Sequence, residues 1–247
     1  MSNRFVGENV HIDMNDVESF FNDRFSRINA LHPLAAVIYQ DNDYELASAR
    51  DRYEKDTLIP LMSLSGCESI LDVGCGIGRW ADALYGKVGS YLGTDFTDGF
   101  IEVASSRCRD KEKFVFLQAD ARNLANVGIE NKFDIVIIAG LFIYLNDEDF
   151  VKVLHNILKL VPSSARIVIR EPLALEKRLT LKKVWSEDLN SNYSAIYRSV
   201  EEFEFVLNKT LGVEGFKIST HGPLYPRALA NRVDTQQFYY ILERVVL

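Results

Sequence analysis

The chain has 247 residues, 47% of them hydrophobic, and a formal net charge of −7 at pH 7. This length is enough to bury one α/β core with small additions, and no apolar run approaches the length needed to cross a bilayer. The negative charge and the lack of a long basic run disfavour a nucleic-acid substrate, because phosphate contacts need a basic face.

The N-terminal segment is expected to be helical. Apolar residues recur at helical spacing between residues 17 and 31, and Asp43 is placed to cap a second helix over residues 44–64. The first residues lack the apolar core of a signal peptide, so we expect a cytoplasmic protein. We divide the chain into an N-terminal helical lid, residues 1–66, and a catalytic domain, residues 67–247.

A strand, a tight glycine turn and a helix follow one another in Ser69 to Gly78, Ser-Ile-Leu-Asp-Val-Gly-Cys-Gly-Ile-Gly. The apolar run contains Asp72 near its end, and Gly74, Gly76 and Gly78 alternate with other residues. Glycine is needed where the backbone takes a positive φ or lies directly against a ligand. In an α/β sheet, such a turn places the ligand at the carboxyl ends of the strands.

The next strand ends in an acid, Asp95, about twenty residues beyond the glycines, where a carboxylate can accept hydrogen bonds from ribose hydroxyls. The pattern therefore predicts a nucleoside site. A dinucleotide fingerprint requires Gly-x-Gly-x-x-Gly, and Arg79 stands where its third glycine belongs. The chain also lacks the Tyr-x-x-x-Lys pair of short-chain oxidoreductases, which further weakens an NAD-dependent alternative.

The remaining core predicts a doubly wound, mostly parallel α/β sheet. Expected strands near residues 69, 91, 114, 133 and 165 alternate with helices, which requires right-handed crossovers between parallel strands. Two late strands, 216–220 and 238–245, are expected as an antiparallel pair at the sheet edge. Residues 173–199 form a polar and aromatic insertion expected to face the substrate, because loops at the carboxyl ends of strands carry function.

Four motifs in the same order resemble the class I S-adenosylmethionine-dependent methyltransferases. They are Glu68 to Gly78, Asp95-Phe96, Phe116 to Ala121 and Phe133 to Gly140, and the resemblance covers roughly residues 68–172. It implies a Rossmann-like fold with a seven-stranded, mostly parallel sheet, an antiparallel C-terminal strand and a helical lid made by the N-terminal segment and the insertion. It also implies S-adenosylmethionine as the cofactor, with S-adenosylhomocysteine as its product.

The resemblance carries residue roles over to this sequence. The cofactor-binding residues that it implies are Asp72, Gly74, Cys75, Gly76, Gly78, Asp95, Phe96, Asp120, Ala121, Gly140 and Leu141. The glycine loop would hold the amino-acid portion, Asp95 the ribose, Phe96 and Asp120 the adenine, and Gly140 would line the floor near the sulfonium.

Substrate contacts are expected from the insertion and from the end of the fifth strand. Tyr193 and Tyr197 are four residues apart and would share one face of a helix, with Arg198 beside them as an anion-binding fork. Arg170 would face the acceptor from the fifth strand. A surface helix with half-buried tyrosines is the alternative reading of the insertion.

The candidates for catalysis and for closing over the cofactor come from segments outside the four motifs. His221, Tyr197 and Glu171 are candidates for handling the acceptor proton, while Tyr39 and Arg52 could close over the carboxylate end of the cofactor or serve in packing. No acidic or histidine cluster has the spacing of a divalent-metal site, so we expect no metal.

The expected activity is methyl transfer to a hydroxyl or phosphate-linked oxygen of a small polar metabolite such as a sugar. Short flanking stretches are similar to methyltransferases of bacterial surface-polysaccharide or secondary-metabolite pathways. An N-methyltransferase acting on an amino sugar or other small amine is the alternative. A non-catalytic binding module with the same fold is the alternative from another class. The expected partner is a small-molecule substrate rather than a nucleic acid or a membrane.

Overall fold

The main sheet of the protein is a doubly wound α/β sheet. The structure is a computed structural model that describes residues 3–28, 33–38, 43–187, 189–230 and 232–244. The strands of this sheet are β2 (Ser69–Val73), β3 (Ser90–Asp95), β4 (Phe114–Gln118), β5 (Ile135–Ala139), β6 (Arg166–Ala174), β9 (Phe216–Pro223) and β10 (Thr235–Arg244). Their spatial order is β4-β3-β2-β5-β6-β10-β9.

The first five of these strands are parallel, and the last strand reverses direction. β10 pairs antiparallel with β6 on one side and with β9 on the other, whereas β2, β3, β4, β5 and β6 pair in parallel. The predicted fold class, including the antiparallel C-terminal strand, is therefore confirmed. Each parallel step requires a crossover connection, which the helices supply.

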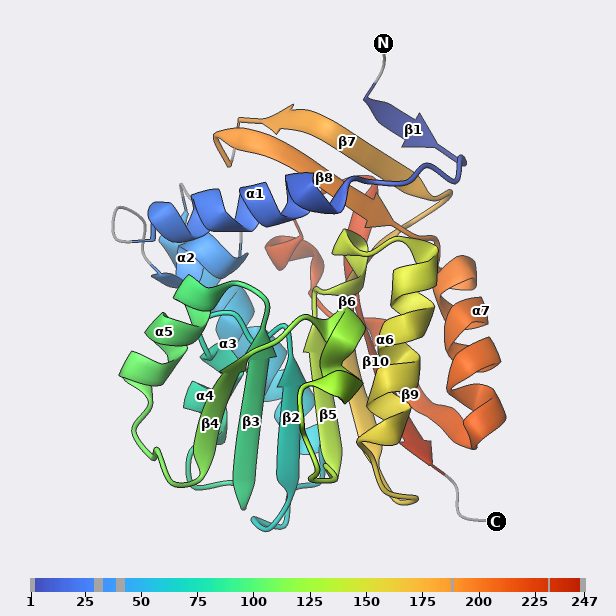
Figure 1. Cartoon of the computed structure of the whole chain (residues 1–247). Helices are drawn as coiled ribbons and strands as arrows, with labels where there is room; N and C mark the ends of the chain where they lie inside the picture. The colour runs from blue at the N-terminus through green and yellow to red at the C-terminus, as the bar shows by residue number, and fades with distance from the viewer. Residues whose placement is uncertain (1–2, 29–32, 39–42, 188, 231, 245–247) are drawn as a thin grey trace.

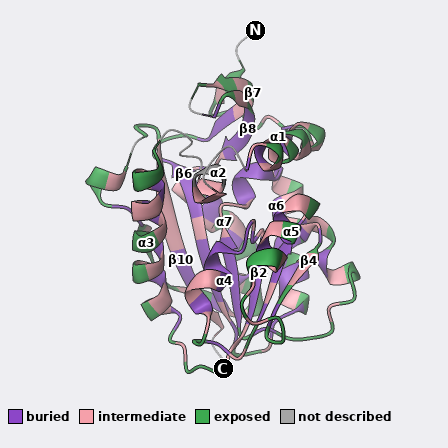
Figure 2. Cartoon of the chain, turned by 90° about the vertical axis from the view of Figure 1, so that its left-hand side faces the viewer, coloured by how far each residue is buried: buried purple, intermediate pink, exposed green. Residues whose placement is uncertain are grey.

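Helices cover both faces of this sheet, as Figures 1 and 2 show. The helices are α1 (Met14–Ser26), α2 (Pro33–Ile38), α3 (Tyr44–Leu61), α4 (Arg79–Leu84), α5 (Asp98–Arg107), α6 (Asp147–Lys159) and α7 (Val200–Thr210), with short 3₁₀ turns η1 (Ala121–Asn126), η2 (Phe142–Tyr144), η3 (Gly212–Glu214) and η4 (Arg227–Leu229). On β2, Leu71 and Val73 join the core beneath α6 and α7, while Ile70 joins the core beneath α3 and α4. This alternation follows from the two-residue period of a strand.

The second predicted N-terminal helix matches α3 closely but lies in the core and not in a lid. Asp43 caps α3 by accepting a hydrogen bond of 2.8 Å from the backbone N–H of Leu46. Leu58 of α3 is fully buried in the core beneath the sheet, and burying such a side chain contributes about 1.5–3 kcal/mol. This helix is therefore part of the core rather than of a lid, and the domain boundary after residue 66 stays a prediction.

A second, three-stranded sheet lies over the carboxyl ends of the parallel strands. It contains β1 (Arg4–Val6), β7 (Leu179–Ser186) and β8 (Ser191–Tyr197) in the order β1-β7-β8, all antiparallel. Figure 1 shows α1 lying between this sheet and the main sheet. We call β1, α1, β7 and β8 the lid.

The expected helix at residues 193–198 is wrong, because the insertion folds as the hairpin β7-β8. Residues four apart share a face on a strand as well as on a helix, so the two tyrosines did not distinguish the two structures. β8 is buried over four consecutive residues, Tyr193 to Ile196, which hides the alternation that marks a half-exposed strand.

Candidate active site

The glycine loop after β2 adopts a backbone that other residues rarely take. Gly74, Gly76 and Gly78 have φ angles of 78°, 54° and 77°. A Cβ on Gly78 would lie 3.1 Å from the ring of Phe116, whereas the nearest atom to a Cβ on Gly76 is a methyl of Val37 at 3.8 Å. Gly78 is thus required by packing, and Gly76 leaves room above the loop.

Asp95 ties this loop to the end of the next strand. Its Oδ2 accepts a hydrogen bond of 2.9 Å from the N–H of Gly76, and its Oδ1 accepts one of 2.9 Å from the N–H of Thr97. Burial raises the pKa of the Asp95 carboxyl, and these two hydrogen bonds oppose the shift. Each carboxylate oxygen keeps a further lone pair for a ligand hydroxyl.

One cavity joins the carboxyl ends of the main sheet to the lid, and its volume is about 710 Å³. The predicted site residues that line it are Gly74, Cys75, Gly76, Asp95, Phe96, Asp120, Ala121, Gly140, Leu141, Arg170, Tyr193 and Tyr197. The predicted residues that do not line it are Asp72, Gly78, Arg52, Glu171, Arg198 and His221. Tyr39 lies outside the described residues. Binding sites for small molecules commonly have this size.

Asp72 lies next to the glycine loop but is buried away from the cavity. The hydroxyl of Tyr91 donates a hydrogen bond of 2.5 Å to its Oδ2, while Oδ1 is buried without a hydrogen-bond partner among the described residues. Burial raises the pKa of Asp72 to about 7. The structure thus places this carboxyl where it supports the loop, not where it directly faces a ligand.

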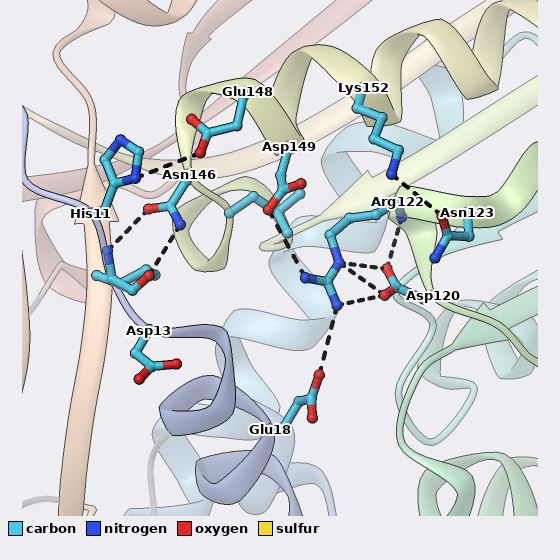
Figure 3. A network of polar contacts seen from close by, with 12 residues as sticks. His11, Asp13, Glu18, Asp120, Arg122, Asn123, Asn146, Glu148, Asp149 and Lys152 are labelled. Atoms are coloured by element: carbon cyan, nitrogen blue, oxygen red, sulfur yellow. Dashed lines mark hydrogen bonds and ion pairs between the residues drawn. The ribbon is translucent and has the colours of Figure 1, made fainter.

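Asp120 is engaged by a neighbouring arginine, which also reaches the lid (Figure 3). Oδ1 of Asp120 accepts a hydrogen bond of 2.8 Å from the N–H of Arg122, and the Arg122 guanidinium lies 2.6 Å from Oδ2. The same guanidinium lies 3.6 Å from Glu18 of α1. The carboxylate expected at the adenine edge therefore also links α1 to the loop after β4.

The chain entering α1 is fixed by a second contact in Figure 3. The side-chain amide of Asn146 accepts a hydrogen bond from the N–H of Ile12 and donates one to its C=O, both 3.0 Å long and buried. His11 lies 3.5 Å from Glu148. This amide fixes the start of the lid helix against α6.

Phe21 of α1 completes an aromatic wall that the sequence reasoning did not assign to the site. Its ring packs edge-to-face on Phe96, Phe100 and Tyr144, with centroid separations of 5.4, 6.3 and 4.9 Å. The helical spacing of apolar residues in this segment predicts a helix but does not show which of them faces the cavity. Because Phe21 and Phe96 both line the cavity, the lid contributes directly to the cavity wall next to Asp95.

Three tyrosine hydroxyls form a row on the lid side of the cavity. The hydroxyl oxygens of Tyr193 and Tyr197 are 3.1 Å apart, and that of Tyr144 is 3.4 Å from Tyr193. Tyr144 belongs to η2, directly after β5, and all three side chains line the cavity. Burial raises the pKa of Tyr197. The prediction of two tyrosines on one face is met by a strand instead of a helix.

Arg198 does not reach the cavity, which corrects its expected role. Its side chain is 2% exposed, and it donates to Oδ1 of Asp147 and to the C=O of Phe142 and of Leu145. Adjacent residues on extended backbone point in opposite directions. Because Tyr197 faces the cavity, Arg198 faces away and serves in structure.

Glu171 likewise has a structural position instead of a catalytic one. Its Oε1 accepts a hydrogen bond of 2.8 Å from the N–H of Ile143, and its Oε2 accepts one of 3.2 Å from the N–H of Leu141. Burial raises its pKa to about 7. Glu171 therefore positions the turn that carries Leu141 and Tyr144 into the cavity.

Glu54 of α3 connects three elements of the cavity wall and was missed in the sequence. Its Oε1 accepts a hydrogen bond of 2.6 Å from Arg79, and its Oε2 lies 3.3 Å from Nε of Arg170 and accepts a 3.3 Å hydrogen bond from the hydroxyl of Tyr225. Burial alone would raise its pKa, but Arg170 and Arg79 outweigh burial and lower the pKa to about 2. The three partners of this carboxylate all line the cavity.

Arg52 and His221 lie outside the cavity, which corrects both assignments. Arg52 is exposed, whereas Arg50 lines the cavity and donates a hydrogen bond of 2.8 Å to the C=O of Leu229. Residues two positions apart on a helix point in directions about 200° apart around its axis. Arg50 and not Arg52 therefore points into the cavity from α3. His221 is half-exposed on the outer strand β9, and its ring lies 3.5 Å from Glu204.

The described part of the chain contains neither a cluster of metal-binding side chains nor a membrane-spanning helix. No group of three or more His, Cys, Asp or Glu side chains is arranged there to hold a metal ion. No described helix combines the length and the apolar character needed to cross a membrane.

Comparison with known proteins finds similarity to methyltransferases over the region that contains the motifs. Residues 70–163 match the family profile described as "Methyltransferase domain". The chain is 30% identical over 122 residues to phosphoethanolamine N-methyltransferase 1 of Triticum aestivum, covering 49% of this chain and 24% of that protein. It is also 30% identical over 142 residues to demethylmenaquinone methyltransferase of Lactococcus lactis, covering 53% of this chain and 54% of that protein. The chain thus spans at most about half the length of these relatives.

The fold agrees with solved structures over almost the whole chain. Phosphoethanolamine N-methyltransferase 1 of Haemonchus contortus, solved with phosphoethanolamine and S-adenosylhomocysteine, superposes with a TM-score of 0.70 at 16% identity, covering 92% of this chain and 48% of that one. The profile and the solved structure agree: residues 70–163 are similar to a methyltransferase domain, and the chain has the Rossmann-like fold of S-adenosylmethionine-dependent methyltransferases.

Proposed function

We propose that this chain transfers a methyl group from S-adenosylmethionine to the nitrogen of a small polar molecule. The observation that carries the proposal is the cavity of about 710 Å³, which the glycine loop and Asp95 line on one side and the lid tyrosines line on the other. A nucleoside-type cofactor and a small acceptor would meet between these two walls.

The cofactor half of the cavity fits S-adenosylmethionine. Gly76 presents backbone without a Cβ, Asp95 has lone pairs for ribose hydroxyls, and Phe96 with Phe21 offers aromatic surface for a base. When bound, the cofactor supplies a methyl group already activated on a sulfonium. The chain's own contribution is to orient the acceptor and exclude water, and positioning alone can supply several kcal/mol of rate acceleration.

The groups around the acceptor half favour nitrogen over oxygen. A hydroxyl acceptor must lose a proton to a base with a suitable pKa, and no histidine lines the cavity within the described residues. Burial raises the pKa of the Tyr197 hydroxyl, which makes it a poor base near neutral pH. An amine needs only to be unprotonated and oriented, and the tyrosine row offers hydroxyl oxygens that accept its N–H groups.

The matched proteins include N-methyltransferases and demethylmenaquinone methyltransferases, so their names support transfer to a small molecule and leave its identity open. This support moves the N-methyl alternative ahead of the oxygen transfer that the sequence favoured. A sugar hydroxyl stays the competing acceptor for the same site.

A matched pair of acceptors tests the proposal. The chain is incubated with methyl-labelled S-adenosylmethionine and either glucosamine or glucose, and the labelled products are separated. The same assay is then extended to a panel of small amines and their hydroxyl analogues. We expect the label on the nitrogen of the amine acceptors. Transfer only to hydroxyls would replace the proposal with O-methylation, and no transfer to any acceptor despite cofactor binding would favour a binding module.

A further inference from the structure

A cluster of charged residues lies where β6 meets α3, and two of its cations, Arg79 and Arg170, line the cavity. Asp51 and Glu54 are the carboxylates in contact with Arg79, Lys55 and Arg170 among the described residues. Two negative charges thus face three positive charges. Arg79 contacts both carboxylates and Lys55 contacts Asp51, so the least compensated charge is on Arg170.

Arg170 is built into the wall and presents an unused edge of its guanidinium. Its side chain is 13% exposed, and Nε lies 3.3 Å from Glu54 without hydrogen-bond geometry. Nη1 donates a long hydrogen bond of 3.4 Å to Gln237, and among the described residues Nη2 has no hydrogen-bond partner. A planar guanidinium with an unused edge suits a carboxylate or a phosphate, which it can bind through two parallel hydrogen bonds.

Further positive charge lies around the same part of the cavity. Burial lowers the pKa of Arg50, and the nearby charges of Arg232 and Arg170 lower it further. Arg232 also lowers the pKa of Tyr197, against the effect of burial. Arg50, Arg170 and Arg232 all line the cavity. Like charges gathered on the wall of a cavity are stabilised when an anion occupies it.

Arg170 lies against the chain that leaves β5. Its Nη1 would lie 2.8 Å from a Cβ on Gly140, so the guanidinium packs against the backbone that ends β5. The tyrosine row begins four residues later, at Tyr144. Arg170 and the tyrosine row therefore lie next to the turn that follows β5.

We infer that the methyl acceptor is a small amine that carries its own anionic group, a carboxylate or a phosphate, and that Arg170 binds this group while the tyrosine row of Tyr144, Tyr193 and Tyr197 orients the nitrogen. This inference rests on the proposed function and names its substrate class. Arg170 and Tyr144 both border the turn after β5, which suits an acceptor whose anionic group and nitrogen lie close together in its chain.

Three amines of similar length test the anion subsite. Ethanolamine, 3-aminopropanoate and O-phosphoethanolamine are titrated calorimetrically into the full chain saturated with S-adenosylhomocysteine. We expect one or both anionic amines to bind at least about tenfold more tightly than ethanolamine, since hydrogen bonds to a charged group are strong, and the preferred amine distinguishes carboxylate from phosphate. Equal binding of the three, or no binding of either anionic amine, overturns the inference.

Variants assign that preference to Arg170. Arg170→Gln should abolish the preference while S-adenosylhomocysteine affinity stays within about twofold, and Arg170→Lys, which keeps the charge without the fork, should retain part of it. Arg107→Gln, an exposed arginine of α5 that does not line the cavity, is the matched control and should bind like the wild type. A preference that survives in Arg170→Gln, or a loss of S-adenosylhomocysteine affinity equal to the loss for the amines, overturns the assignment.

The titration, together with the methyl-transfer assay of the proposed function, separates this inference from the proposed function. If the wild type binds S-adenosylhomocysteine and methylates neutral amines without any anionic preference, only the anion subsite is wrong. If it binds no S-adenosylhomocysteine, the proposed function itself is wrong.

Discussion

The backbone N–H of Gly76 donates a 2.9 Å hydrogen bond to Oδ2 of Asp95, so the glycine loop and the acid that ends the next strand form one unit. Parallel pairing of β2 with β3 brings these two chain segments to the same edge of the sheet. The carboxylate therefore has two tasks, to fix the loop and to face the cavity, and a change at Asp95 tests both.

Replacing Asp95 tests the ribose assignment. Asp95→Ala removes the expected acceptor of ribose hydroxyls and should weaken S-adenosylhomocysteine binding by about 1.5–3 kcal/mol, the typical contribution of hydrogen bonds to a charged group. Calorimetric titration measures this loss. Asp95→Asn keeps the shape and one acceptor oxygen and should lose less. Affinity that is unchanged in Asp95→Ala would remove Asp95 from the site.

Removing the charge of Glu54 should destabilise the fold. Glu54 is 1% exposed and contacts Arg79 and Arg170, so Glu54→Gln leaves buried guanidinium groups without their partner, at a cost of about 3–5 kcal/mol in the free energy of unfolding. Denaturant unfolding measures the change. Asp56→Asn, an exposed acid on the same helix, is the control and should stay within about 0.5 kcal/mol of the wild type. A Glu54→Gln variant as stable as this control would contradict the account of the network.

Buried carboxyls predict that stability falls as the pH rises from about 4.5 to 7. Burial raises the pKa of Asp72 and that of Glu171 to about 7, so in this range the folded chain keeps protons that the unfolded chain has lost. The free energy of unfolding should decrease by at most about 1.4 kcal/mol per pH unit for each group, and level off above pH 7. Below pH 4.5 the opposite trend sets in, because the lowered pKa of Glu54 stabilises the fold only while that group is ionised.

Unfolding measured across this range, with Asp72→Asn as the comparison, checks the assignment. The variant cannot titrate at residue 72 and should show a shallower decrease between pH 4.5 and 7. An identical slope in the variant and in the wild type would show that Asp72 does not carry the effect.

Two adjacent residues of the insertion should respond in opposite ways. Tyr197→Phe removes a hydroxyl that lines the cavity, and should lower turnover of an amine acceptor while changing the free energy of unfolding by only about 1 kcal/mol. Arg198→Gln breaks a buried pair with Asp147, and should cost about 3 kcal/mol or more in stability. Methyl-transfer kinetics and thermal unfolding of both variants measure this contrast. A Tyr197→Phe variant with the turnover rate of the wild type would contradict the prediction.

The sequence predicted the part of the fold that follows strong local rules. The Gly-x-Gly-x-Gly loop, Asp95 at a strand end and the alternation of strands and helices together determine a parallel sheet and its ligand edge. The cavity residues of this shared core, from Gly74 to Leu141, were predicted through the resemblance to the class I methyltransferases, whose motifs lie at the carboxyl ends of the strands.

The lid and the buried ion pairs could not be predicted in the same way. Tyr193 and Tyr197 have a spacing that suits both a helix and a strand, and the partner strand β1 is distant in the sequence. Glu54 looked like one charged residue of an amphipathic helix, since its partners Arg79, Arg170 and Tyr225 come from three other elements. Contacts of this kind depend on tertiary packing, which periodicity does not encode.

The central claim is tested most directly by calorimetric titration of the purified chain with S-adenosylhomocysteine, with NAD as the control. The account predicts saturable binding of S-adenosylhomocysteine that weakens in Asp95→Ala, and no binding of NAD. Binding of NAD alone, or of neither ligand, would contradict the assignment of this cavity as a methyltransferase cofactor site.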